Sequence, residues 1–135
     1  MNYLRDNYSE KIYCVNILGG SEIAFKLAAE FNAAFIQLDS VCGHLAHDDL
    51  KFAKDLNALR SSSNAFLLGG VRFKYQPVNS GRAFDEDLTL GKGRCDALVV
   101  TGSGTGIGTK LNAFIEYPRV PKNSARFPIS ELANV

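Results

Sequence analysis

The chain has 135 residues, of which 46% are hydrophobic and 21% charged, and its formal net charge is +1. This length and composition fit one globular domain. The nearly neutral charge gives no electrostatic reason to expect a nucleic-acid partner or an anionic membrane surface. No run of ~18 apolar residues occurs, so the sequence predicts no transmembrane segment.

The N-terminus and the cysteines bear on the cellular compartment. The opening residues, Met-Asn-Tyr-Leu-Arg-Asp-Asn-Tyr, lack the apolar core and cleavage pattern of a secretory signal. Cys14, Cys42 and Cys95 are odd in number and widely spaced, which argues against a disulfide framework and against a CxxC metal site. We therefore expect a reducing, cytoplasmic setting.

Four short runs have strand character, because each is almost continuously apolar and rich in branched or aromatic side chains. Such runs are typical of strands that are buried on both faces of a parallel sheet. The runs are residues 12–18, 34–38, 65–68 and 97–100.

Helical patterns lie between these runs, with apolar residues recurring at helical spacing. Ser21 can cap a first helix over about residues 22–31, and Asp48 or Asp49 can begin a second that reaches Leu59. A third helix is predicted from about Phe84 to Arg94, where two glycines weaken its end. The predicted apolar sides are Ile23, Ala24, Leu27, Ala28 and Phe31 in the first helix, Leu50, Phe52, Ala53, Leu56 and Leu59 in the second, and Phe84, Leu88 and Leu90 in the third.

This alternation predicts an α/β fold of parallel βα units. The runs start about 20 to 30 residues apart, close to the spacing of a βαβ unit. Right-handed crossovers place the strand C-termini at one end, where ligands bind in α/β sheets and barrels. The segments expected there are Gly19-Gly20, Asp39-Ser40, residues 69–74 and residues 101–106.

The turn Thr101-Gly102-Ser103-Gly104-Thr105-Gly106 is the clearest ligand signal. Its glycines let the backbone approach a ligand closely, and free N–H groups with Ser and Thr hydroxyls favour an anion such as phosphate. It is neither a P-loop nor a dinucleotide fingerprint, since no Gly-Lys-Ser/Thr ends it and it follows a late strand. The alternative is a glycine turn that binds nothing.

Two cations follow the third run. Arg72 and Lys74 point the same way if their segment stays extended, and together they could bind a phosphate or carboxylate. A desolvated Lys74 could instead serve as a base or Schiff-base nucleophile. The alternative is a pair of solvated surface charges.

Asp39 closes the second run, a position where it could act as a base or bind a ligand hydroxyl, or simply cap the next turn. His44 and His47 have no matching third ligand nearby, so we predict no metal site and a solvated loop. Cys42 and His44 are an unpromising nucleophile pair, since neighbours in sequence seldom have the required geometry.

In order along the chain, these residues resemble the BtpA/SgcQ family of predicted TIM-barrel proteins over residues 12–116. Val15-Asn16-Ile17-Leu18 resembles the family's Val-Asn-Val-Leu strand, and Ala34-Phe35-Ile36-Gln37-Leu38 its Phe-Ile-Arg-Val strand. Lys74 stands where the family has a lysine. The most specific stretch runs from Cys95 to Gly106 and resembles Ala-Asp-Ala-x-x-Val-Thr-Gly-x-x-Thr-Gly.

The resemblance implies a TIM-barrel enzyme or an assembly factor for membrane-complex biogenesis. The chain departs from the family at the usual Lys-His pair, which is Lys74-Tyr75 here, and at the arginine after Phe-Ile, which is Gln37. A complete barrel has ~250 residues and eight strands, whereas this chain supplies about four. We expect a partial, half TIM-barrel-like domain over residues 1–117 and an irregular proline-containing tail over 118–135.

A half barrel can be a fragment of a larger product, can pair with a second copy, or can close as a small open sheet with the tail over one edge. Our hypothesis is a protein that binds a small phosphorylated or anionic metabolite; the sequence identifies no cofactor, no nucleic-acid partner and no reaction. The alternatives are a non-catalytic assembly factor and a truncated inactive fragment. The candidate residues are Asp39 and Lys74 for catalysis and Asn16, Arg72, Thr101, Gly102, Ser103, Gly104, Thr105 and Gly106 for ligand binding.

Overall fold

The computed structural model describes residues 2–102 and residue 104. Helices and strands alternate after a short N-terminal helix, so the predicted α/β fold is confirmed. The elements are α1 (Asn2–Asn7), β1 (Cys14–Asn16), α2 (Ser21–Glu30), β2 (Phe35–Cys42), α3 (Asp49–Ser61), β3 (Phe66–Val71), α4 (Phe84–Lys92) and β4 (Ala97–Val99).

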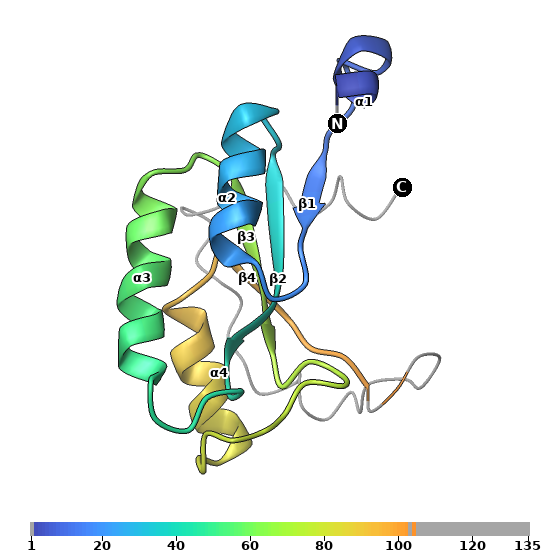
Figure 1. Cartoon of the computed structure of the whole chain (residues 1–135). Coiled ribbons are helices and arrows are strands. Elements are labelled where there is room, and N and C mark those ends of the chain that lie inside the picture. The colour runs from blue at the N-terminus through green and yellow to red at the C-terminus, as the bar shows by residue number, and fades with distance from the viewer. Residues whose placement is uncertain (1, 103, 105–135) are drawn as a thin grey trace.

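The strands form one sheet in the order β1-β2-β3-β4, and every neighbouring pair is parallel. The chain therefore steps across the sheet in one direction without reversing. Figure 1 shows the result: α2, α3 and α4 lie together beside the sheet, and the strands all run toward the same end, the lower one in that view.

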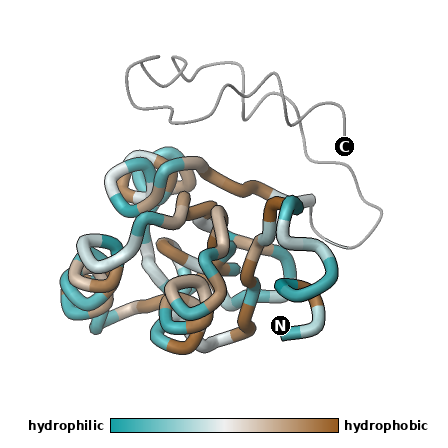
Figure 2. Tube along the Cα trace, turned by 90° about the horizontal axis from the view of Figure 1, so that it is seen from above, coloured by the Kyte–Doolittle hydropathy of each residue, from teal (hydrophilic) through white to brown (hydrophobic). Residues whose placement is uncertain are grey.

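The buried face of the sheet carries the core. Val15, Ile36 and Leu67 are paired across β1, β2 and β3, and all three are buried. The neighbouring row, Asn16, Gln37 and Leu68, alternates to the other face and is exposed or half-buried. The expectation of strands buried on both faces is therefore met on one face only, within the part of the chain that the structure describes. In the view along the sheet, hydrophobic segments gather between the helices and the strands (Figure 2).

Close packing of α4 on the sheet depends on Gly91. A Cβ atom at Gly91 would lie 2.7 Å from Cγ2 of Val71 and 3.0 Å from Cδ2 of Leu98. Glycine lowers the stability of a helix, but at position 91 it lets α4 pack closely against β3 and β4.

Several element details differ from the predictions. The strand β3 continues through Gly69-Gly70-Val71, which we expected to be a loop, and α1 was not predicted. Ser21 is the first residue of α2 rather than its cap, and Gly20 holds the cap position. Leu50 and Leu90 are exposed, whereas Phe25 is buried. The spacing of apolar residues predicts where a helix lies more accurately than it predicts which residues on its apolar side are buried.

The proposed boundary at residue 117 and the tail from 118 to 135 lie outside the described residues. Within residues 2–102 and 104, no helix is long and apolar enough to cross a membrane.

Candidate functional site at the strand C-termini

Hydrogen bonds join the segments at the C-terminal ends of neighbouring strands. Asn79 and Ser80, in the loop after β3, donate their backbone N–H groups to the carbonyl oxygen of Gly43, after β2, at 2.9 and 3.2 Å. The loop after β3 is also bonded to the segment after β4, and the last residue of β1 to β2. The lower end of the sheet in Figure 1 is therefore a connected rim rather than a set of separate loops.

Asn16 and Asp39 meet on this rim. Nδ2 of Asn16, the last residue of β1, donates a hydrogen bond to Oδ1 of Asp39 in β2 at 3.3 Å. Both side chains come from the face of the sheet opposite the helices. The contact fixes the carboxylate at the place where barrel proteins carry their reacting groups.

A bulge in β2 surrounds Asp39. The register with β3 shifts between Leu38 and Cys42, and a Cβ atom at Gly70 would lie 2.0 Å from the carbonyl oxygen of Asp39. Only glycine at position 70 lets that carbonyl approach β3 so closely. The hydroxyl of Ser40, in the same bulge, is buried without a hydrogen-bond partner within the described residues. Bulges are over-represented at barrel rims and beside active sites.

Lys74 is brought to the glycine-rich turn. Its backbone N–H donates to Oγ1 of Thr101 at 2.8 Å, which joins the loop after β3 to the residues after β4. Gly102 and Gly104 follow and are half-buried. The predicted ligand-binding residues Ser103, Thr105 and Gly106 lie outside the described residues.

Arg72 does not lie in an extended segment. Its φ is +47°, so the chain turns directly after β3, and the alternation of Arg72 with Lys74 that we predicted is absent. Nε of Arg72 donates to Oδ2 of Asp87 at 2.9 Å and Nη2 to the carbonyl oxygen of Arg82 at 2.6 Å. Its guanidinium also lies over the ring of Phe84, 5.5 Å from the centroid. This side chain therefore holds the loop in place.

Arg72 belongs to an ion-pair network that the sequence did not predict. Asp87 is fully buried and also accepts hydrogen bonds from Nε of Arg82 and Oγ of Ser80, at 2.9 and 2.8 Å. Asp49, at the start of α3, receives Nη1 and Nη2 of Arg94 at 2.6 and 2.7 Å. Nη2 of Arg82 reaches Asp49 as well, at 3.2 Å. The network thus joins α3, α4 and two loops beneath the rim.

Both carboxylates are held in the charged form. Burial raises the pKa of Asp87, but the hydrogen bonds from Arg82, Ser80 and Arg72 outweigh it, so the pKa lies below its ordinary value. The hydrogen bond from Arg94 is the largest cause that lowers the pKa of Asp49. In each case the pairing compensates the desolvation of a buried charge.

Cys42 and His44 lie beside this network. Burial raises the pKa of the Cys42 thiol, whose polar contacts are Asp87 and Arg82 at 3.6 and 3.7 Å rather than a histidine. Such a thiol is a poor nucleophile. Of the predicted solvated loop, His47 is exposed, whereas His44 is half-buried with its ring edge-on to Phe52 at 5.0 Å. Burial lowers the pKa of this imidazole.

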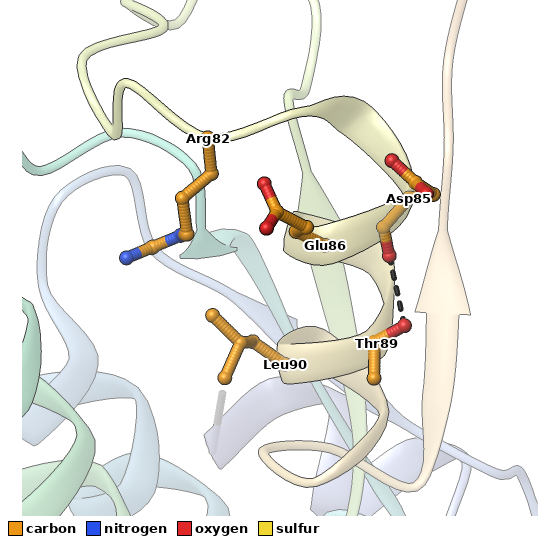
Figure 3. A pocket seen from close by; sticks show the side chains of 5 residues that line it. All are labelled: Arg82, Asp85, Glu86, Thr89 and Leu90. Carbon is orange, nitrogen blue, oxygen red and sulfur yellow. Dashed lines mark hydrogen bonds between the residues drawn. The ribbon is translucent and has the colours of Figure 1, made fainter.

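A hollow of about 340 Å³ lies beside α4 (Figure 3) and is lined by Arg82, Asp85, Glu86, Thr89 and Leu90. Oγ1 of Thr89 donates to the carbonyl oxygen of Asp85, Glu86 accepts the backbone N–H of Ala83, and Arg82 bonds to Asp87 and Asp49. Among residues 2–102 and 104, no group of three or more His, Cys, Asp or Glu side chains is placed to hold a metal ion.

Comparison of the chain with protein-family models, with curated proteins and with solved structures found no match in any of the three.

Proposed function

We propose that this protein binds a small phosphorylated or otherwise anionic metabolite at the C-terminal rim of its parallel sheet. The observation that carries the proposal is the hydrogen bond from the Lys74 backbone to Thr101, because it brings a lysine-bearing loop to the start of a glycine-rich turn. Backbone N–H groups of such a turn, hydroxyls and a nearby ammonium group are the donors that phosphate sites use.

The roles of the two cations then differ. Lys74 supplies charge close to the turn, whereas Arg72 positions the loop through its contacts with Asp87 and the Arg82 carbonyl. Removing Arg72 is therefore expected to loosen the site indirectly.

Asp39 is the proposed acid or base in this arrangement. Asn16 holds its carboxylate on the open side of the sheet, and the bulge places it at the rim. A carboxylate beside an anion site could take a proton from a bound metabolite or contact its hydroxyl groups. The glycine-rich turn of this proposed site belongs to the segment from Cys95 to Gly106, whose resemblance to the BtpA/SgcQ signature supports the proposed kinship.

Isothermal titration with inorganic phosphate and with ribose 5-phosphate tests the proposal. Gly104→Val is expected to weaken binding at least tenfold because its side chain obstructs the turn, and Thr101→Val because it loses the Oγ1 acceptor for the Lys74 N–H. Thr89→Val is the matched control, since Oγ1 of Thr89 bonds only within α4. If the folded wild-type chain binds neither probe, the proposal is wrong, and the non-catalytic assembly factor and the truncated inactive fragment are the remaining candidates.

A further inference from the structure

Three hydrogen bonds join the loop after β3 to the loop after β2, and we call this set of bonds the latch. The backbone N–H groups of Asn79 and Ser80 donate to the carbonyl oxygen of Gly43 at 2.9 and 3.2 Å. Nδ2 of Asn79 donates to the carbonyl oxygen of His44 at 3.2 Å. Both loops lie at the rim, the lower end of the sheet in Figure 1. The position of the loop after β3 therefore depends on the backbone of residues 43 and 44.

Gly43 provides the shared acceptor of the latch. Its φ is +92°, and a Cβ atom at this position would lie 3.1 Å from Cγ of Arg72 and 3.1 Å from Oδ2 of Asp87. Glycine adopts this conformation without strain and leaves room for the buried carboxylate. Because His44 is the next residue, a change in its backbone shifts the carbonyl oxygen of Gly43 as well as its own.

The ring of His44 packs in a half-buried site. It lies edge-on to the ring of Phe52 in α3, with centroids 5.0 Å apart. Nδ1 is buried and has no hydrogen-bond partner within the described residues. In the neutral tautomer with its proton on Nε2, Nδ1 is only an acceptor, whereas in the charged ring both nitrogens are donors. Protonation thus creates a buried, charged donor without an acceptor, which is costly.

The charged groups around His44 do not offset this cost. Burial is the largest influence on the pKa of His44 and lowers it, and the positive charge of Arg94 acts in the same direction. Asp49 of α3 and the backbone of Cys42 oppose them. Both carboxylate oxygens of Asp49, however, already accept hydrogen bonds from Nη1 and Nη2 of Arg94, at 2.6 and 2.7 Å. The packed position of the ring therefore favours its neutral form.

The ends of the loop after β3 have further anchors that do not involve the latch. Arg72, at its start, donates to the buried carboxylate of Asp87. Ser80 and Arg82, near its end, donate to the same carboxylate. The lowered pKa of Asp87 keeps this group charged through the pH range in which a histidine titrates. Loss of the latch therefore loosens the middle of the loop, residues 73–79, and leaves its ends attached.

We propose that protonation of His44 opens the latch, so that mild acid loosens the loop after β3 and weakens the anion site at the rim. The charged ring moves out to water, and the backbone that follows it takes both acceptor carbonyl groups away from Asn79 and Ser80. The opening follows from the contacts of His44, whereas its effect on an anion rests on the proposed function.

The direction of the pH effect follows from proton linkage. The closed latch holds a neutral ring with a lowered pKa, whereas a histidine ring in water has the ordinary value of ~6.5. The open form therefore binds one more proton in this range. Its ratio to the closed form rises by up to about tenfold for each pH unit below ~6.5 and is constant above that value.

Nuclear magnetic resonance of the full chain measures the latch without a ligand. The scalar coupling across the hydrogen bond from the Asn79 N–H to the Gly43 carbonyl reports whether that bond exists, and the ring signals of His44 report its protonation. Between pH 7.5 and pH 5, we expect the coupling to fall with the midpoint of the His44 titration. The bond from the Ala33 N–H to the Ala28 carbonyl, at the end of α2, is the internal control, and its coupling should stay constant.

His47 offers a matched control variant, because it is exposed in the same loop and is the other of the chain's two histidines. His47→Gln should keep the pH response of the Asn79 coupling, and His44→Gln, which takes up no proton in this range, should remove it. A wild-type coupling that stays constant while His44 titrates would overturn the proposal. A pH response that persists in folded His44→Gln would overturn it as well.

Isothermal titration with sulfate tests the effect on the site, because the charge of sulfate does not change in this pH range. Its affinity for the wild type and for His47→Gln should fall by up to about tenfold per pH unit below ~6.5, as the closed fraction falls. His44→Gln should bind sulfate equally at pH 7.5 and pH 5. Equal affinities at the two pH values in the wild type would refute control of the site by the latch. If no anion binds at any pH, the proposed function fails, and the coupling still decides whether the latch opens.

Discussion

The buried carboxylate of Asp87 accepts a hydrogen bond from Nε of Arg72 at 2.9 Å, and this contact connects the end of β3 to the first turn of α4. Arg72 has a positive φ, which is uncommon for a residue with a long side chain. The ion pair thus holds the backbone in the turn that carries Lys74 toward Thr101. A buried ion pair that fixes a loop also preorganises the rim at which we propose the binding site.

Replacing Asp87 by Asn should therefore destabilise the fold strongly. The variant removes the buried carboxylate that pairs with Arg72 and takes from Arg82 one of its two charged acceptors, and breaking such a buried pair costs about 3–5 kcal/mol. Urea denaturation followed by far-UV circular dichroism measures the loss. Asp85→Asn is the control, because Asp85 is exposed in the same helical turn. Equal urea midpoints for Asp87→Asn and Asp85→Asn would show that the ion pairs of Asp87 do not stabilise the fold.

The stability of the protein should fall on acidification in two stages. The pKa of His44 is lowered by burial, so its neutral form is favoured in the fold, and stability decreases as the pH falls below the unfolded value of ~6.5. The lowered pKa values of Asp49 and Asp87 add a second loss as the pH falls below ~4, where the unfolded chain begins to bind protons. Denaturation midpoints measured from pH 8 to pH 3 follow both stages. His44→Gln should remove the first stage and keep the second; a variant that keeps both would show that His44 is not responsible.

Gly70→Ala should distort the bulge around Asp39. The added Cβ atom would lie 2.0 Å from the Asp39 carbonyl oxygen, so one of the two strands must move, at a cost of about 1–3 kcal/mol. Gly93→Ala provides the control, since the nearest atom to its Cβ lies at 3.5 Å and its backbone is in the helical region. The denaturation midpoint should fall for the first variant and stay level or rise for the second. Two unchanged midpoints would show that the close approach is unimportant.

Asp96 should prove structural, although it belongs to the stretch that resembles the family signature. Its Oδ2 accepts the backbone N–H of Leu67 and its Oδ1 accepts Nη2 of Arg60, both at 2.8 Å. These contacts lie at the N-terminal end of the sheet, where barrel proteins carry stability rather than chemistry. Asp96→Ala should cost about 1–3 kcal/mol by leaving a partly buried donor unpaired, as measured by thermal and urea unfolding.

Asp55→Ala is the control for Asp96, because Asp55 pairs with Lys51 on the exposed side of α3. Asp96→Ala should leave the affinity for inorganic phosphate unchanged at a temperature where the variant is folded. A selective loss of phosphate binding without a loss of stability would place Asp96 in the site instead.

The residues of the rim were accessible to sequence reasoning to different degrees. The positions of Asp39 and Thr101 could be predicted because each directly follows an apolar run that was predicted to be a strand. Parallel topology brings the residues after such strands to the same end of the sheet. Asn16 was predicted to bind the ligand only because its strand resembles the Val-Asn-Val-Leu strand of the BtpA/SgcQ family. The tie between Lys74 and Thr101 had no sequence signal, since it joins a backbone group to a side chain 27 residues away.

The sequence by itself determined the repeating elements, because the spacing of apolar residues within a run reflects local backbone geometry. The tertiary structure alone decided which charges are structural. Asp49, Asp87 and Arg94 stand in or beside helices, where charged residues usually face solvent, and only the packing of α3 and α4 on the sheet buries the two carboxylates beside their arginines. The strand order likewise decided that α2, α3 and α4 all cover the same face of the sheet, because burial depends on elements that are distant in the chain and not on the run that forms each strand.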